Sequence, residues 1–343
     1  MNGILDLHVD SIIQQRLFRY AIDRRHHPGV PGQPLFWHAD IPRMIEAGYR
    51  GACMGIHYYP WESERGWAEL QRQVSYLDEV AAGDDRVVRV RGASDWDRVR
   101  GDGKLGLVPG IEGAHMLNAR IERVSALAEM GVAYLTLTHF SANAAATPSI
   151  GRGANELDGL TAFGRRLVRE LNYYGIAVDV AHVNTPGVIE ACQTSRAPVF
   201  CTHTGVRGVH DDSRNITDAE LDAIAETGGV VGIILAPVFL AGKLRADTEV
   251  ALDHYEYVID RVGIDHVAIG SDYDGWLPTI LSDHRDCRDI HRLVDGLRSR
   301  GYGDDAIEGL VAGNALRAFR DVDRQAGRQA TDTPAVATSE KSR

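Results

Sequence analysis

Short apolar segments alternate with longer amphipathic segments along nearly the whole chain, and this alternation constrains the fold more than any other feature. Apolar strands separated by helices are typical of a parallel sheet that helices cover on both faces. Eight strands are the number that closes such a sheet into a barrel, although the pattern alone also permits an open, doubly wound sheet. The eight apolar segments are ILDLHVD (4–10), GACMGIHYY (51–59), KLGLVPGIEG (104–113), VAYLTLTH (132–139), IAVDVAH (176–182), APVFCTH (197–203), GGVVGIIL (228–235) and DHVAIGSD (265–272).

The segments between these predicted strands carry helix signals. TAFGRRLVRELNYYG, residues 161–175, places its apolar side chains on one stripe, and Gly175 is a natural stop. Further helices are predicted over 217–227, which opens with the capping motif TDAE, over 248–262 and over 286–300. No GxGxxG follows the first strand and no Walker sequence occurs, so little favours a nucleotide-binding fold.

These signals predict a single barrel domain over residues 1–322. Residues 12–40, which include RRHHPGVPGQP, are interpreted as an inserted first loop that carries short helices. From Asp323 onward the sequence is polar, rich in Thr, Ala and Ser, and without apolar periodicity. Residues 323–343 are therefore predicted to form a disordered tail.

Charge and cysteine content narrow the class of protein. The net charge of −11 argues against nucleic acid or an anionic membrane surface as the main partner. No run of about 18 apolar residues and no basic-then-apolar leader occurs, so we expect a soluble, cytoplasmic protein. Cys53, Cys192, Cys201 and Cys287 are scattered and form no CxxC pair. They are expected to be buried free thiols in a reducing compartment.

Residues that bind metals or carry protons stand at the ends of six of the eight predicted strands. In a barrel of parallel strands all C-terminal strand ends face one mouth, so residues far apart in sequence would converge on one pocket. One histidine at a strand end is weak support for a site, whereas six coinciding strand ends are strong support. The residues are His8 and Asp10, Glu112, His139, His182, His203 and Asp272.

Imidazoles together with carboxylates suit a borderline divalent metal, most naturally zinc. In the HxD sequence of the first strand, His8 and Asp10 lie on the same side of the chain and can reach a common ion. The whole set offers more ligands than one open catalytic zinc needs, so two metals that share Glu112 are the economical interpretation. Such a pair lowers the pKa of a bound water towards ~7. No lysine stands at a strand end to be carbamylated as a bridge, so Glu112 must bridge.

Each of these residues also has a structural interpretation. His8 and Asp10 would also fit a buried histidine–aspartate hydrogen bond, and Glu112, between two glycines, would fit a turn. His182 and His203 would also fit core histidines, and His139 would fit a structural residue that lies near the metals without touching them. One of Asp272 and Asp274 is expected to serve the loop turn. His115 is placed in the outer shell or a loop. The histidines expected to be solvated are His26, His27, His254, His266, His284 and His291.

Six motifs, taken in order, resemble the membrane (renal) dipeptidase family of binuclear zinc peptidases. The motifs are DLHVD, GIEGAH (110–115), LTLTH (135–139), DVAHVN (179–184), THTGVRGVHDDSRNITD (202–218) and GSDYDG (270–275). The match runs from about residue 4 to residue 320. The resemblance implies a (β/α)8 TIM barrel of the metal-dependent amidohydrolase type, and it suggests a homodimer.

The resemblance also implies the metal ligands. His8 and Asp10 would bind the first zinc, Glu112 would bridge, and His182 and His203 would bind the second zinc. These are the same residues that the strand ends single out.

Three further roles follow from the resemblance alone. His139 would contact the substrate near the scissile carbonyl, and Asp272 would move protons. Arg214, in DDSRN, would hold the terminal carboxylate of a short peptide. The expected reaction is hydrolysis of the peptide bond by a metal-bridging hydroxide.

Two loops depart from the family pattern, and they put the substrate in doubt. Residues 140–160, FSANAAATPSIGRGANELDGL, differ from the polar, Trp-containing stretch that the resemblance leads us to expect there. The first loop, 12–40, also differs from the family pattern. One alternative is therefore a related binuclear amidohydrolase acting on N-acyl amino acids, β-lactams or lactones. The other is a non-catalytic metal-binding protein that kept the fold.

Overall fold

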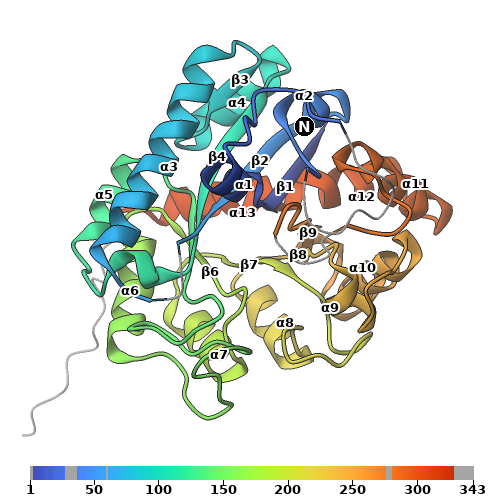
Figure 1. Cartoon of the computed structure of the whole chain (residues 1–343). Coiled ribbons are helices and arrows are strands. Elements are labelled where there is room, and N and C mark those ends of the chain that lie inside the picture. The colour runs from blue at the N-terminus through green and yellow to red at the C-terminus, as the bar shows by residue number, and fades with distance from the viewer. Residues whose placement is uncertain (1–2, 28–36, 59–60, 276–279, 328–343) are drawn as a thin grey trace, which may run out of the picture.

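The computed structural model describes residues 3–27, 37–58, 61–275 and 280–327 (Figure 1). Eight parallel strands close into a barrel, because each pairs with the next barrel strand and the last pairs back with the first through Ile269 and Asp6. Helices surround this barrel, which confirms the predicted (β/α)8 fold. The barrel strands are β1 (Ile4–Val9), β2 (Tyr49–Ile56), β4 (Leu105–Glu112), β5 (Tyr134–Thr136), β6 (Ala177–Asp179), β7 (Val199–Thr204), β8 (Val230–Ile233) and β9 (Val267–Ile269).

A ninth strand, β3 (Val87–Arg89), lies outside the barrel, and the apolar pattern did not predict it. It pairs with the start of β4, whose later residues pair with β5. In this segment, RVVRVR (86–91), arginines interrupt the valines, so no continuous apolar run marks the strand. The barrel strands are also shorter than the apolar runs; β2 ends at Ile56, and Tyr59 lies outside the described residues.

The helices agree with the sequence signals in type and position. Helix α6 ends at Tyr173, and Gly175 follows with a φ of 69°. Thr217 and Glu220 form a complete capping box at the start of α8. The helix predicted over 286–300 is a 3-10 turn, Cys287–Ile290, followed by α11. The helices are α1 (Ser11–Phe18), α2 (Ile41–Glu46), α3 (Glu64–Gly83), α4 (Ala93–Asp102), α5 (Arg123–Glu129), α6 (Ala162–Tyr173), α7 (Thr185–Thr194), α8 (Asp218–Glu226), α9 (Pro237–Ala241), α10 (Thr248–Val262), α11 (His291–Ser299), α12 (Asp304–Glu308) and α13 (Asn314–Gln325).

The first loop and the C-terminal segment differ in detail from the sequence prediction. Helix α1 occupies the start of the 12–40 insertion, and residues 28–36 lie outside the described residues. At the other end, α13 continues to Gln325 with Val322 buried, so the helix extends past Asp323, where the polar tail was predicted to begin. Residues 328–343 lie outside the described part of the chain.

The interior is mainly apolar, and it also encloses many polar side chains. All four cysteines are buried and free, as predicted. His254 and His284, predicted to be solvated, are buried instead. His254 contacts the Val206 N–H and the Leu240 carbonyl, and such backbone partners explain how a histidine among polar neighbours in sequence becomes a core residue. Among the described helices, none is both long enough and apolar enough to span a membrane.

Candidate metal centre

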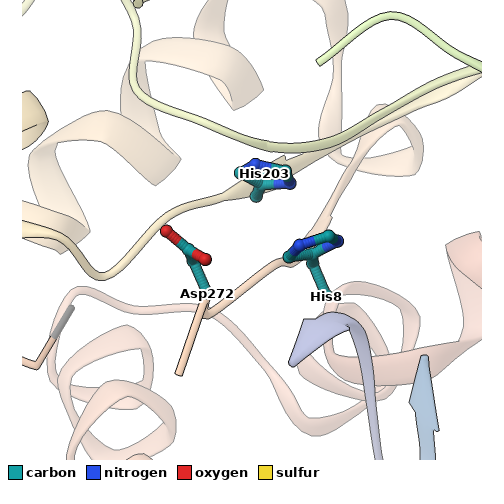
Figure 2. Close-up of side chains that lie close together, drawn as sticks. All are labelled: His8, His203 and Asp272. Carbon is teal, nitrogen blue, oxygen red and sulfur yellow. The ribbon is translucent and has the colours of Figure 1, made fainter. Parts of the chain in front are cut away.

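The strand-end residues meet at the C-terminal mouth of the barrel, around a cavity of about 230 Å³. Figure 2 shows how His8 of β1, His203 of β7 and Asp272, which follows β9, face one another. Glu112 ends β4, while His139 and His182 follow β5 and β6. The convergence that the parallel strands predicted is therefore present in the structure. The cavity is lined by Asp10, Glu112, His139, His182, His203, Arg214 and Asp272, among others.

Glu112 lies at the centre of this group. Its Oε1 atom is surrounded by the Nε2 atoms of four histidines, at 2.9 Å from His182, 3.4 Å from His203, 3.5 Å from His139 and 3.6 Å from His8. Four imidazole nitrogens around one carboxylate oxygen exceed what hydrogen bonding to that atom can use. The arrangement instead resembles a set of ligands turned towards a common centre.

Two sets of ligand atoms overlap at Glu112. The ligand atoms of His8, Asp10 and Glu112 all lie within 4.8 Å of one another, and so do those of Glu112, His182 and His203. Ligands bound at about 2.0–2.2 Å to one tetrahedral ion lie roughly 3.3–3.6 Å apart, so small side-chain shifts would bring each set around one ion. The geometry therefore fits two ions that share Glu112. A third set, His8, His203 and Asp272, also lies within 4.8 Å.

Hydrogen bonding and charge provide a second test of the fit. His8 Nε2, Asp10 Oδ1 and Glu112 Oε2 are buried and form no hydrogen bond among the residues that the structure describes. Buried polar atoms without partners are costly, and the carboxylates of Asp10, Glu112 and Asp272 concentrate negative charge in one place. Divalent cations would satisfy these atoms and neutralise the charge, so the residues present fit a metal centre.

Burial and neighbouring charges shift the pKa values of these groups. Burial lowers the pKa of His182 to about 3 and the pKa values of His139 and His203 well below their ordinary value, which keeps these imidazoles neutral. Burial alone would also lower the pKa of His8, but Asp10 and then Glu112 raise it to about 10. Burial and the nearby Asp10 raise the pKa of Asp272 well above its ordinary value. Neutral imidazole is the form that binds a metal ion.

The local backbone conformation helps to place several of these side chains at the cavity. His182 and Asp272 adopt positive φ values of 68° and 59°, a conformation that non-glycine residues rarely adopt and that often marks a functional site. Gly55 in β2 lets the strand pass close to the ligands, because a Cβ there would lie 2.1 Å from Asp10 Oδ1 and 2.8 Å from His8 Nε2. A glycine inside a strand is typical of such close approach.

Arg214 lies beside the proposed ligands, in the loop after β7. Its side chain is buried, Nη2 donates to the His203 carbonyl at 3.0 Å, and the guanidinium lies 5.8 Å from the Phe239 ring centre. The Nε atom is buried with no hydrogen-bond partner among the described residues. Arg214 also lines a second cavity of about 270 Å³, which His182 lines as well. A buried cation at the cavity wall is suited to bind an anionic group.

Sequence reasoning missed His57, which directly follows β2. Its Nδ1 lies 3.4 Å from Glu112 Oε2, and its side chain lines the cavity. The signal was available, because an imidazole stood near the end of the second apolar run. Asp6, which shares the two-residue spacing of His8 and Asp10, does not line the cavity; it accepts hydrogen bonds from the backbone N–H groups of His8 and Ser271.

Asp274 and His115, for which the sequence allowed either a place near the site or a loop role, bond to neighbouring loops. Asp274 accepts hydrogen bonds from the Ser11 hydroxyl and from the backbone N–H of His38, so it fixes the loop after β9 against the first loop. His115 Nε2 contacts Ser141 at 2.9 Å in the loop after β5. Both residues support the walls of the cavity rather than line it.

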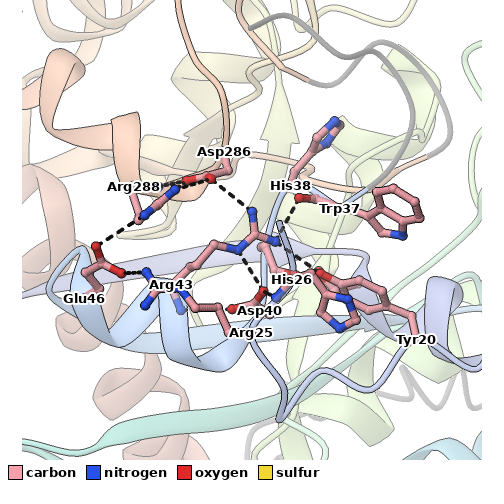
Figure 3. A network of polar contacts seen from close by, with 12 residues as sticks. Tyr20, Arg25, His26, Trp37, His38, Asp40, Arg43, Glu46, Asp286 and Arg288 are labelled. Atoms are coloured by element: carbon pink, nitrogen blue, oxygen red, sulfur yellow. Dashed lines mark hydrogen bonds and ion pairs between the residues drawn. The ribbon is translucent and has the colours of Figure 1, made fainter. Parts of the chain in front are cut away.

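A buried network of ion pairs around Arg43 connects the first loop with the segment before α11 (Figure 3). Arg43 of α2 is fully buried and donates to Asp40 at 2.7 Å, to Asp286 at 3.0 Å and to the Tyr20 hydroxyl at 3.2 Å. Asp40 also caps α2. Arg43 therefore connects the start of α2 with Tyr20 and with Asp286. The network stabilises the loops on one side of the site.

Comparisons with known proteins agree with this geometry. A family model described as membrane dipeptidase (peptidase family M19) matches residues 3–333. Dipeptidase 3 of Rattus norvegicus is 32% identical over 226 residues, which cover 64% of this chain and 46% of that protein. Dipeptidase tcpJ of Claviceps purpurea (strain 20.1) is 27% identical over 324 residues, 91% of this chain and 75% of that protein. This chain spans less than half the length of the rodent Dipeptidase 3 proteins that it matches.

A solved structure is similar over nearly the whole chain. The crystal structure of a metallo peptidase from Rhodobacter sphaeroides, liganded with a phosphinate mimic of the dipeptide L-Ala-D-Ala, has a TM-score of 0.83 at 25% identity. The match covers 94% of this chain and 99% of that chain. The family model and this structure confirm the resemblance found in the sequence motifs, and the protein belongs to the membrane dipeptidase family, peptidase family M19.

Proposed function

We propose that this protein is a metal-dependent dipeptidase that hydrolyses the peptide bond of short peptides with a free terminal carboxylate. The observation that carries the proposal is the position of Glu112 in two buried ligand sets, with Arg214 in the same cavity. The relatives named above are dipeptidases, and the Rhodobacter sphaeroides structure holds a dipeptide mimic, which supports the same activity here.

The proposed cofactors are two zinc ions. His8 and Asp10 would hold one ion, His182 and His203 the other, and Glu112 both. When bound, two such ions supply Lewis-acid polarisation of a carbonyl and activation of water at neutral pH. The nitrogen and carboxylate donors favour zinc over magnesium or calcium, which prefer all-oxygen sites.

Asp272 and His139 are assigned to the proton transfers and the carbonyl. The Asp272 carboxylate lies within 4.8 Å of the ligand atoms of His8 and His203, on the cavity wall. From there it accepts the proton of the attacking water and returns it to the leaving amine, which departs only when protonated. The neutral His139 imidazole, 3.5 Å from Glu112 Oε1, donates a hydrogen bond to the carbonyl oxygen as negative charge develops.

Arg214 supplies the preference for very short peptides. Its guanidinium would bind the terminal carboxylate of the substrate, so the scissile bond must lie about one residue from the chain end. The apolar residues of the cavity wall include Ile13, Leu17 and Phe140, and the small volume of about 230 Å³ leaves room for a compact substrate. An N-acyl amino acid also carries a free carboxylate and is the second candidate substrate.

The test combines metal analysis with a panel of L–L, L–D and N-acylated dipeptides and their C-terminal amides. We expect about two zinc ions per chain and cleavage of free dipeptides but not of their amides. Faster cleavage of N-acyl amino acids would transfer the assignment to the related amidohydrolase. A zinc-loaded protein inert towards every amide and ester would leave a non-catalytic metal-binding protein. Cytoplasmic location and a homodimer stay predictions from the sequence.

A further inference from the structure

The two ring nitrogens of His8 face different surroundings. Nε2 lies 3.2 Å from Asp10 Oδ1 and 3.6 Å from Glu112 Oε1, on the side of the proposed metal. Nδ1 lies 2.8 Å from the hydroxyl of Tyr134, on the opposite edge of the ring. Both side chains are fully buried, so water does not compete for this contact.

The Tyr134 contact suits the tautomer that a metal-binding His8 needs. For Nε2 to offer a lone pair to a metal ion, Nδ1 must hold the N–H, and that N–H then requires an acceptor. The hydroxyl oxygen of Tyr134, 2.8 Å away, is placed to accept it. Partners of this kind fix the tautomer and the orientation of a metal-binding imidazole.

The sequence makes space for the Tyr134 ring. Tyr134 opens β5 and pairs with Gly110 of β4, two residues before Glu112. A Cβ at Gly110 would lie 2.0 Å from Tyr134 Cζ and 2.3 Å from its hydroxyl oxygen. The first glycine of GIEG is therefore needed for the tyrosine ring to reach across the barrel to β1.

We propose that Tyr134 is a positioning residue for His8, which it holds with Nε2 directed at the metal ion shared with Asp10 and Glu112. The inference rests on the proposed metal centre and extends it to a residue in the barrel interior. The contact is made to one of the two ligand sets only, so its loss is expected to affect the two ions unequally.

The other ligand set has its own support. His203 Nδ1 lies 3.0 Å from the Thr202 hydroxyl, which donates to Asp179 at 2.9 Å. This chain of contacts does not involve Tyr134, so the binding of an ion to His182 and His203 remains as an internal reference in a variant of Tyr134.

The test is a zinc titration of the metal-free protein against a competing chelator, with Tyr134→Phe beside the wild type. The matched control is Tyr49→Phe, because the Tyr49 hydroxyl is also fully buried but has no hydrogen-bond partner among the described residues. For Tyr134→Phe we expect one of the two zinc affinities to fall about 10–100-fold, the usual effect of losing such a partner, and the other to stay within a factor of two or so. Tyr49→Phe should bind both ions like the wild type.

The thermal unfolding midpoint of each metal-free variant shows whether the fold is intact. Equal zinc affinities in Tyr134→Phe and the wild type would overturn the proposal, as would an equal loss in Tyr49→Phe. The titration uses no peptide, so it is independent of the reaction. A wild type that binds two zinc ions but cleaves no dipeptide would overturn the proposed activity alone, whereas one that binds no zinc would overturn the metal centre and the role of Tyr134 together.

Discussion

The imidazoles of His8 and His203 are stacked, with ring centroids 4.0 Å apart and an angle of 29° between the planes. They come from β1 and β7, which are not neighbours in the barrel. Their Nε2 atoms point to the same oxygen of Glu112, at 3.6 and 3.4 Å. Two charged rings would repel one another at this separation, and the pKa of His203, lowered by burial and then by His8, keeps one ring neutral.

This stacked pair predicts separable metal binding. His8→Ala and His203→Ala should each reduce bound zinc from about two ions per chain to about one, because each removes a ligand from a different set. Both should lower kcat/KM roughly 100-fold or more, a larger effect than the loss of an outer partner. Metal content is measured by elemental analysis after dialysis. His27→Ala, at an exposed histidine, is the control, and full metal content in either ligand variant would contradict the two-ion arrangement.

Asp272→Asn should lower kcat by about 10²–10⁴-fold and leave bound zinc unchanged, because general acid–base groups contribute that much. The change keeps the size of the side chain and removes its ability to carry the proton. Asp274→Asn, two residues away, is the comparison: Asp274 bonds Ser11 and His38, so its variant should lose thermal stability more than turnover. Unchanged kcat in Asp272→Asn would exclude it as the proton carrier.

Arg214→Met should raise the KM for a free dipeptide by roughly 30-fold or more, since losing one partner of a buried charge pair costs about 2 kcal/mol or more. The kcat should change much less, because the guanidinium is placed at the substrate's end and not at the reacting bond. The C-terminal amide of the same dipeptide, which lacks the carboxylate, should be cleaved by neither protein, so the difference between them is confined to the free dipeptide. An unchanged KM for the free dipeptide would rule out the carboxylate role.

The sequence predicts the strand-end residues because parallel strands direct their C-terminal ends to one mouth. This rule needs no knowledge of side-chain contacts, and it places residues as distant as His8 and Asp272 together. It fails for His57, which two tyrosines separate from the end of its apolar run. It also cannot separate Asp10, which lines the cavity, from Asp6, which has the same spacing from His8 but bonds backbone N–H groups.

Contacts across the barrel could not be predicted from the sequence. The meeting of Tyr134 with His8, and the close approach of Gly55 to Asp10, depend on the barrel's register and curvature. The buried state of His254 has a similar cause, because its partners are backbone groups of residues 206 and 240 that only the fold brings near. The spacing of residues in the sequence indicates which side chains of one strand share a face. It does not indicate how far apart side chains of different strands lie.

Gly55→Ala should selectively weaken the ion held by His8 and Asp10. A methyl group at this position would lie 2.1 Å from Asp10 Oδ1, so either the carboxylate or the strand must move. We expect a loss of at least about 10-fold in the affinity for one of the two zinc ions, comparable to other disturbances of ligand orientation. Gly303→Ala, where an added Cβ meets nothing within 4 Å, should bind zinc normally. Normal binding in Gly55→Ala as well would show that the strand adjusts without cost.

Acid should destabilise the protein through His254, a buried histidine that does not line the metal cavity. His254 is fully buried in α10, its Nδ1 accepts from Val206 N–H at 2.9 Å, and its Nε2 donates to the Leu240 carbonyl at 2.9 Å. Burial lowers its pKa from the ordinary 6.5 to about 4. Between these values the unfolded chain binds more protons than the folded one, so the free energy of unfolding falls as the pH falls from 6.5 towards 4.

At about 1.4 kcal/mol per pKa unit, this histidine alone removes roughly 3 kcal/mol over that interval. His254→Gln keeps a donor and an acceptor but does not titrate, so it should be less stable than the wild type at pH 7.5 and should lose less stability on acidification. Urea unfolding at several pH values between 7.5 and 4.5 measures both slopes. His115 and His284, whose pKa values burial also lowers to about 4, act equally in the two proteins, so the difference between the slopes isolates His254. If the free energy of unfolding depended on pH equally in both proteins, protonation of His254 would not contribute to the acid sensitivity of the fold.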